Sequence, residues 1–60
     1  MKKYIYKTNN IEYIITNVEY ANISGKECYI YNQVLNNNKA GKTIHRMSIE
    51  EYKTLKQIED

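Results

Sequence analysis

The chain has 60 residues, a formal net charge of +2, one cysteine, one histidine and no proline or tryptophan. A chain of this length forms a single domain, residues 1–60, which buries only about 60% of the surface that its unfolded form exposes. One cysteine excludes an internal disulfide, and one cysteine with one histidine excludes a zinc site. Small domains are usually stabilised by disulfides, bound metals or self-association, and only self-association remains for this chain. We therefore expect a homo-oligomer, a dimer or larger.

The start of the chain indicates a cytoplasmic protein. Met1, Lys2 and Lys3 resemble the beginning of a signal peptide, but no apolar segment follows them. No stretch approaches the roughly 20 apolar residues of a membrane-spanning helix, so we expect no membrane partner. The abundance of isoleucine, lysine, asparagine and tyrosine is typical of AT-rich bacterial or phage genomes, so we expect a bacterial host cell.

The first segment has the alternation of a strand. Residues 3–7 place Tyr4 and Tyr6 on one face and apolar or basic residues on the other, which predicts a strand. Asn9 and Asn10 follow, and asparagine tolerates a positive φ better than most residues. The pair therefore predicts a two-residue hairpin turn.

Two further strands follow. In residues 11–20 the apolar positions change from odd to even numbers, and a bulge near residues 15–17 reconciles the two phases. Residues 23–26 contain a serine–glycine pair and predict the next turn. Residues 27–35 alternate again and predict the third strand, and the polar residues 36–41 predict an exposed loop.

The last third of the chain predicts a fourth strand and a helix. Residues 43–47 alternate like a strand, Ser48 occupies the position of a helix N-cap, and Glu51 completes a capping box. Apolar residues then recur at helical spacing over residues 49–58. The apolar face of this predicted helix consists of Ile49, Tyr52, Leu55 and Ile58.

These elements predict an α+β fold, a four-stranded curved antiparallel sheet followed by one C-terminal helix (β-β-β-β-α). One helix covers only one face of such a sheet. The other face is then left with tyrosines, which suit a wet interface because they are apolar with a polar tip. The tyrosines expected there, against a second copy or a ligand, are Tyr4, Tyr6, Tyr29 and Tyr31.

No catalytic site, metal site or cofactor is predicted. Gly41 and Lys42 resemble the end of a phosphate-binding loop, but Asn36 stands where that motif needs a glycine, and the segment joins two strands. His45 has only Cys28 as a possible nucleophile, with no third group to orient its ring. We therefore expect a protein that is not an enzyme.

Basic residues gather before the predicted helix. Residues 31–47 contain Lys39, Lys42 and Arg46 and no acidic residue, a net charge of +3. One interpretation is a solubilised hairpin. The other is a single-strand binding site, in which these cations meet phosphates while Tyr29 and Tyr31 stack on bases.

Residues 27–58 resemble the single-stranded-DNA-binding domain of the positive cofactor four family of transcriptional coactivators. The matching parts are a strand with Tyr29, Ile30 and Tyr31, a loop ending in Gly41 and Lys42, a short strand with Ile44, Met47 with Ser48, and a helix with Glu50, Glu51, Tyr52 and Leu55. The resemblance implies a dimer formed through helices, with single strands held on the sheet. It places Lys42, Arg46 and the sheet tyrosines against the strand, and Ile49, Tyr52 and Leu55 in core and dimer contacts. The chain departs from the family in having fewer basic residues and in the hairpin at Asn9.

The chain is also similar to small phage-encoded inhibitors of bacterial defence, including some anti-CRISPR proteins, in its length, single domain and composition. That resemblance implies occupation of a partner surface and carries over no residues. Binding dominated by phosphates needs several neutralising contacts, and this chain is nearly neutral and poor in arginine. The sequence therefore favours a non-enzymatic inhibitor that binds a host protein or defence complex, with single-stranded nucleic-acid binding as the alternative.

Overall fold

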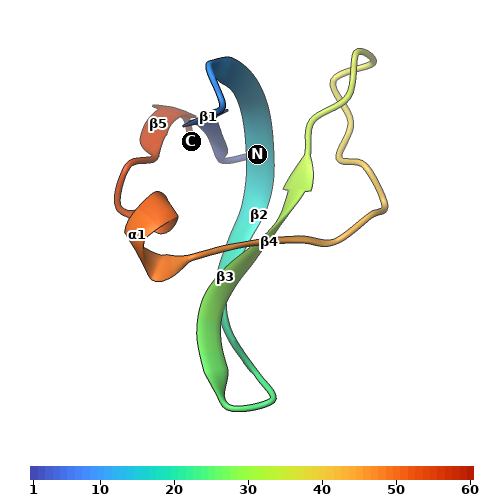
Figure 1. Cartoon of the computed structure of the whole chain (residues 1–60). Helices are drawn as coiled ribbons and strands as arrows, with labels where there is room; N and C mark the ends of the chain where they lie inside the picture. Colours follow the sequence, from blue (N-terminus) through green and yellow to red (C-terminus); the bar gives the residue numbers. More distant parts are fainter.

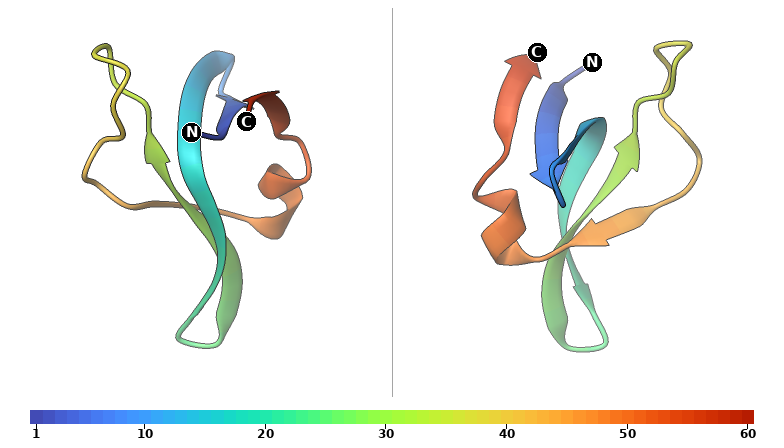
Figure 2. Two further views of the ribbon diagram at one scale, coloured as in Figure 1. Left: turned by 180° about the vertical axis from the view of Figure 1, so that it is seen from behind. Right: turned by 45° about the horizontal axis from the view of Figure 1, so that its top comes forward.

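The computed structural model describes all 60 residues as one curled antiparallel sheet (Figure 1). Its elements are β1 (Lys3–Thr8), β2 (Ile11–Ile23), β3 (Lys26–Gln33), β4 (His45–Met47), α1 (Ile49–Tyr52) and β5 (Lys56–Glu59). The strand order is β4-β3-β2-β1-β5, so the last strand lies beside the first. Figure 2 shows α1 and β5 curled back beside β1, with the two termini close together.

The predicted α+β fold with a C-terminal helix over residues 49–58 is wrong, because the chain is mostly β. The helix ends after one turn, and residues 56–59 form the fifth strand. An isolated helix of ten residues is marginal in water, and the Thr54 hydroxyl donates a hydrogen bond to the Glu51 carbonyl oxygen at 2.7 Å, where the helix stops. Pairing with β1 instead gives backbone partners to both strands, with Tyr4 opposite Gln57 and Ile5 opposite Lys56.

The two predicted turns and the predicted bulge are confirmed. Asn9 and Asn10 adopt φ of 52° and 63°, the left-handed values of a tight hairpin turn between β1 and β2. Ser24 and Gly25 make the same kind of turn between β2 and β3, with φ of 53° and 82°. The register between β2 and β3 shifts after Thr16, where the next residue also has a positive φ.

The bulge keeps the aromatic and aliphatic residues of β2 on one side of the sheet. Before it, Tyr13 and Ile15 face the interior, and after it Tyr20 pairs with Tyr29 on the same face. The small core consists of Tyr6, Ile15 and Met47, with further tyrosines packed against it. The tyrosines of the first and third strands therefore lie on this inner face, which α1 partly covers, and not on the uncovered face as expected.

An aliphatic row crosses the opposite, outer face of the sheet. Ile5 pairs with Ile14, the amide of Val34 donates to the Ile14 carbonyl oxygen at 2.8 Å, and Val34 forms a bridge with Ala40. We call Ile5, Ile14, Val34 and Ala40 the outer row. No helix lies on this face, and Ile14 is 36% exposed.

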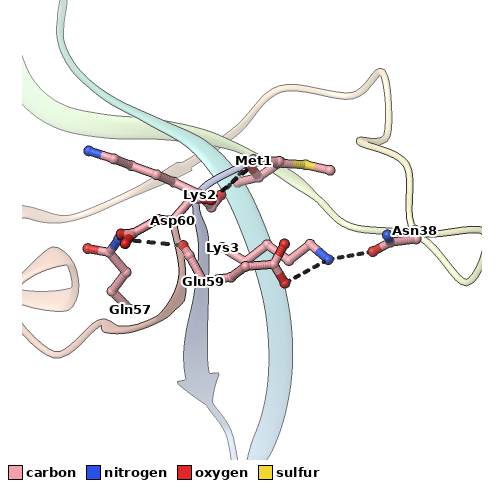
Figure 3. Close-up of polar contacts among 8 residues, drawn as sticks. Met1, Lys2, Lys3, Asn38, Gln57, Glu59 and Asp60 are labelled. Carbon is pink, nitrogen blue, oxygen red and sulfur yellow. Dashed lines mark hydrogen bonds and ion pairs between the residues drawn. The ribbon is translucent and has the colours of Figure 1, made fainter.

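The pairing of β1 with β5 brings the ends of the chain together (Figure 3). The Lys3 ammonium lies 3.3 Å from the Glu59 carboxylate and donates to the Asn38 side-chain oxygen at 2.5 Å. The Met1 ammonium donates to the Asp60 carbonyl oxygen at 3.4 Å. An exposed ion pair contributes little by itself, but these contacts hold the β3–β4 loop and both termini at one end of the sheet.

The predicted capping box is also confirmed. The Ser48 hydroxyl accepts a hydrogen bond from the Glu51 amide at 3.1 Å, and the Glu51 carboxylate accepts one from the Ser48 amide at 3.0 Å. The cap holds a helix of only four residues, and no helix of the chain is long and apolar enough to cross a membrane. The capping box therefore forms the corner between β4 and β5.

Replacing Ser48 with alanine should lower the free energy of unfolding by about 1 kcal/mol, because the Glu51 amide loses the hydroxyl oxygen that caps it. Urea denaturation followed by circular dichroism measures this change. Thr43→Ala is the matched control, since that hydroxyl is exposed and outside the cap. Equal midpoints for the two variants would contradict the role assigned to the cap.

Candidate binding site

Aromatic rings line the inner face in two groups. In the first, Tyr31 meets Tyr6 edge to face, with ring centroids 5.7 Å apart and planes at 73°. The other side of this group is formed by His45, whose ring stacks on Tyr31 with centroids 5.4 Å apart. The cross-strand pairing of Tyr31 with His45 in β4 produces this stack.

The second group lies nearer the β2–β3 turn. Tyr29 stacks flat on Tyr52, with ring centroids 3.6 Å apart and planes at 2°, and meets Tyr20 edge to face at 5.9 Å. Tyr20 is 54% exposed and Tyr52 is 37% exposed. Because its flat contact is already filled by Tyr52, Tyr29 has less ring surface to offer a base than an isolated strand tyrosine.

The first group lines a half-open cavity of about 260 Å³ between the β1–β2 hairpin and β3 with β4. We call this the tyrosine cavity. The side chains that give it its chemistry are Tyr6, Thr8, Tyr13, Tyr31, Gln33 and His45. None of its lining residues is a lysine, arginine, aspartate or glutamate. The cavity therefore offers aromatic rings and neutral hydrogen-bonding groups.

A carboxylate is hydrogen-bonded to one of the residues that line the tyrosine cavity. The Tyr6 hydroxyl donates to the Glu51 carboxylate, which also accepts from the amide and hydroxyl of Ser48. Burial and this hydrogen bond raise the pKa of Tyr6 to about 12, and the bonds from Tyr6 and the Ser48 amide lower the pKa of Glu51. Burial and the negative charge of Glu51 also raise the pKa of Tyr31. The Glu51 charge is therefore coupled to both Tyr6 and Tyr31.

A second cavity, of about 380 Å³, lies beside β4 and the β2–β3 hairpin. Lys26, Arg46 and Glu27 contribute charges of both signs, and the buried Cys28 lies among them. Cys28 and His45 thus line different cavities. The structure does not assemble them into a nucleophile–base pair, and no three metal-ligating side chains gather anywhere in the chain.

The predicted phosphate contacts and stacking rings are not brought to one face. Arg46 pairs with Ile30 on the outer face, whereas Tyr31 pairs with His45 on the inner face. Lys39 and Lys42 are exposed in the β3–β4 loop. The cations and the tyrosines therefore do not form one continuous groove.

The residues predicted for a helical dimer interface have separate surroundings. Leu55 packs against the core, Tyr52 stacks on Tyr29, and Ile49 is half-buried on the single turn of α1. One turn offers too short a face for helix packing, so the helical dimer implied by the resemblance loses its structural basis.

Sequence reasoning missed several functional candidates. Gln33 and Thr8 reach the tyrosine cavity, and the outer row crosses the opposite face. The part of the tyrosine cavity that the β1–β2 hairpin forms could have been predicted from the sequence. A two-residue turn at Asn9 and Asn10 sets Tyr6 opposite Tyr13. The contribution of Gln33 depends on the register after the bulge, which the sequence leaves open.

No protein-family model, curated protein or solved structure matches this chain. The resemblances to positive cofactor four and to the phage inhibitors therefore stay predictions, and the residues themselves carry the argument for function.

Replacing Tyr6 with phenylalanine should lower the free energy of unfolding by about 1.5 kcal/mol, because Glu51 loses a hydrogen bond. The raised pKa of Tyr6 means that its contribution is complete below pH 10 and is lost as the pH rises through about 12. Tyrosine absorbance during alkaline titration should show one phenol near 12 that the variant lacks. Tyr4→Phe is the control, and the same loss of stability in both variants would contradict the Tyr6–Glu51 bond.

Proposed function

We propose that this chain is a small cytoplasmic, non-enzymatic binding protein that self-associates and acts by covering the surface of a protein partner. The observation that carries the proposal is the distribution of apolar side chains. Four hydrophobic residues are buried, whereas nine large ones are exposed. The exposed residues are Met1, Ile11, Ile14, Tyr20, Ile23, Leu35, Ile44, Tyr52 and Ile58. A core this small favours a fold that gains stability from an interface.

The outer row is the surface that best fits a protein partner. Ile5 and Ile14 lie on paired strands, and Val34 and Ala40 extend the row through an isolated bridge, with Lys7 opposite Glu12 beside them and the Lys3–Glu59 pair on the other side. Charges of both signs around an apolar centre are typical of protein interfaces. A polyphosphate would instead require cations alone.

Inhibition of a host factor is the action that we propose for this binding. A single domain with two binding faces and no assembled catalytic group acts by occupying a surface. The near-neutral charge opposes mimicry of DNA, and the composition supports a phage or mobile-element source with a bacterial host protein or defence complex as the partner.

Replacing Ile14 with glutamate should convert the oligomer to a monomer at micromolar concentration, because a charge then lies at the centre of the outer row. Light scattering with size-exclusion chromatography measures the mass, and circular dichroism verifies the fold. Ile44→Glu is the matched control, since Ile44 is 66% exposed and outside the row. A wild type that is monomeric, or a control that dissociates equally, would contradict an interface at the outer row.

Single-stranded nucleic-acid binding is the second candidate. The observation that favours it is the short β4 strand, where exposed His45 stacks on Tyr31 on one face and the next residue, Arg46, is exposed on the other. The loop before it adds exposed Lys39 and Lys42. An oligomer could combine these cations from several copies into one stripe.

Fluorescence anisotropy with a labelled single-stranded oligonucleotide at two salt concentrations tests this candidate. Binding through phosphates should weaken steeply with salt and disappear in the double variant Lys42→Glu with Arg46→Glu. Lys53→Glu reverses a charge at the C-cap of α1 and is the control. Absence of binding at low salt would remove the second candidate.

A further inference from the structure

The walls of the tyrosine cavity have the chemistry of a site for an organic cation. Tyr6 and Tyr31 meet edge to face and His45 stacks on Tyr31, so these contacts cover part of both phenol rings, while Tyr13 contributes a third phenol to the lining. Aromatic ring faces attract cations through their quadrupoles. No lysine or arginine lines the cavity to repel such a ligand.

The polar groups of the cavity are matched to a donor. The amide oxygen of Gln33 and the hydroxyl oxygens of Thr8 and Tyr13 can accept hydrogen bonds. A guanidinium group carries five N–H donors in one plane and also stacks on aromatic rings. Phosphates and carboxylates would find no lysine or arginine here.

The charged group nearest to Tyr6, the Glu51 carboxylate, is negative, as a site for a cation requires. The Glu51 carboxylate accepts a hydrogen bond from the hydroxyl of Tyr6, whose ring lines the tyrosine cavity, while Glu51 itself lines the second cavity. Its negative charge is felt at Tyr31 as well. A cation between these rings is therefore attracted by the rings and by the Glu51 carboxylate.

The size of the cavity limits the ligand to a single head group. Its volume of about 260 Å³ lies below the range of about 300–1,000 Å³ typical of sites for drug-sized molecules. A nucleotide would have to leave its sugar and phosphate outside. The head of one side chain fits the volume and the chemistry.

We propose that the tyrosine cavity binds the guanidinium group of an arginine side chain presented by the protein partner. Only the source of the arginine depends on the proposed function; the preference of the cavity for a guanidinium group does not. The cavity lies on the inner face, opposite the outer row, so one chain offers two separate contacts.

The test is a titration with N-acetylarginine amide, followed by ¹H–¹⁵N NMR of the protein and by the ring-current shift of the arginine Hδ protons. N-acetylcitrulline amide is the matched ligand, because its urea group has nearly the same shape and no charge. Arginine should bind about tenfold more tightly than citrulline, with shifts centred on Thr8, Gln33 and His45. Equal binding of the two ligands, or no shift with arginine, would overturn the proposal.

Two variants locate the effect. Glu51→Gln retains a side chain suited to the capping box but removes the charge, and it should reduce the preference for arginine over citrulline. Tyr13→Leu removes one wall and should abolish binding, whereas Tyr20→Leu, outside the cavity, should leave it unchanged. If Tyr13→Leu fails to fold, the test rests on Glu51→Gln. An unchanged preference of Glu51→Gln for arginine over citrulline would overturn the role of the carboxylate.

Adenosine monophosphate is the competing ligand. Displacement of arginine by this nucleotide would assign the cavity to a base and overturn the proposal. The arginine titration is independent of the measurement of oligomeric state, because it can be carried out and interpreted even if the wild type is a monomer. A failed arginine titration likewise leaves the outer row untouched.

Discussion

The hydrogen bond between Tyr6 and Glu51 connects the two halves of this fold. Glu51 caps α1 through Ser48 and accepts the hydroxyl of Tyr6, which lies in the centre of the core on β1. The corner after β4 is thereby attached to the strand that β5 must join. With Met47 buried directly before the cap, the chain can pass from one edge of the sheet to the other within a few residues.

The same carboxylate links stability to the proposed binding chemistry. Its charge is stabilised by donors from the cap and from Tyr6, so it stays ionised beside the tyrosine cavity. A core built from phenols instead of phenylalanine leaves hydroxyl groups at its margin. Those groups make the inner face suitable for a polar cation, whereas the outer row is aliphatic and suits a protein surface.

Local chemistry predicted the local structure well. The turn at Asn9 and Asn10, the bulge before Val18 and the cap at Ser48 each depend on a few neighbouring residues, and each is present. The candidate site was predicted only in part. Tyr6 and Tyr31 were predicted as binding residues, and both line the tyrosine cavity. Arg46 was predicted with them but lies on the other face, because neighbouring residues of a strand point to opposite faces.

The sequence by itself determined the first four strands, their turns and the start of the helix, because alternation, positive φ and capping act over short distances. Only the tertiary structure decided the fate of residues 56–59. Their spacing suits a helix, but the free edge of β1 offers backbone partners that a ten-residue helix in water cannot match. Which face became the interior was decided in the same way, since Met47 and Leu55 pack with the tyrosines and Ile15 and leave Ile14 exposed on the outer face.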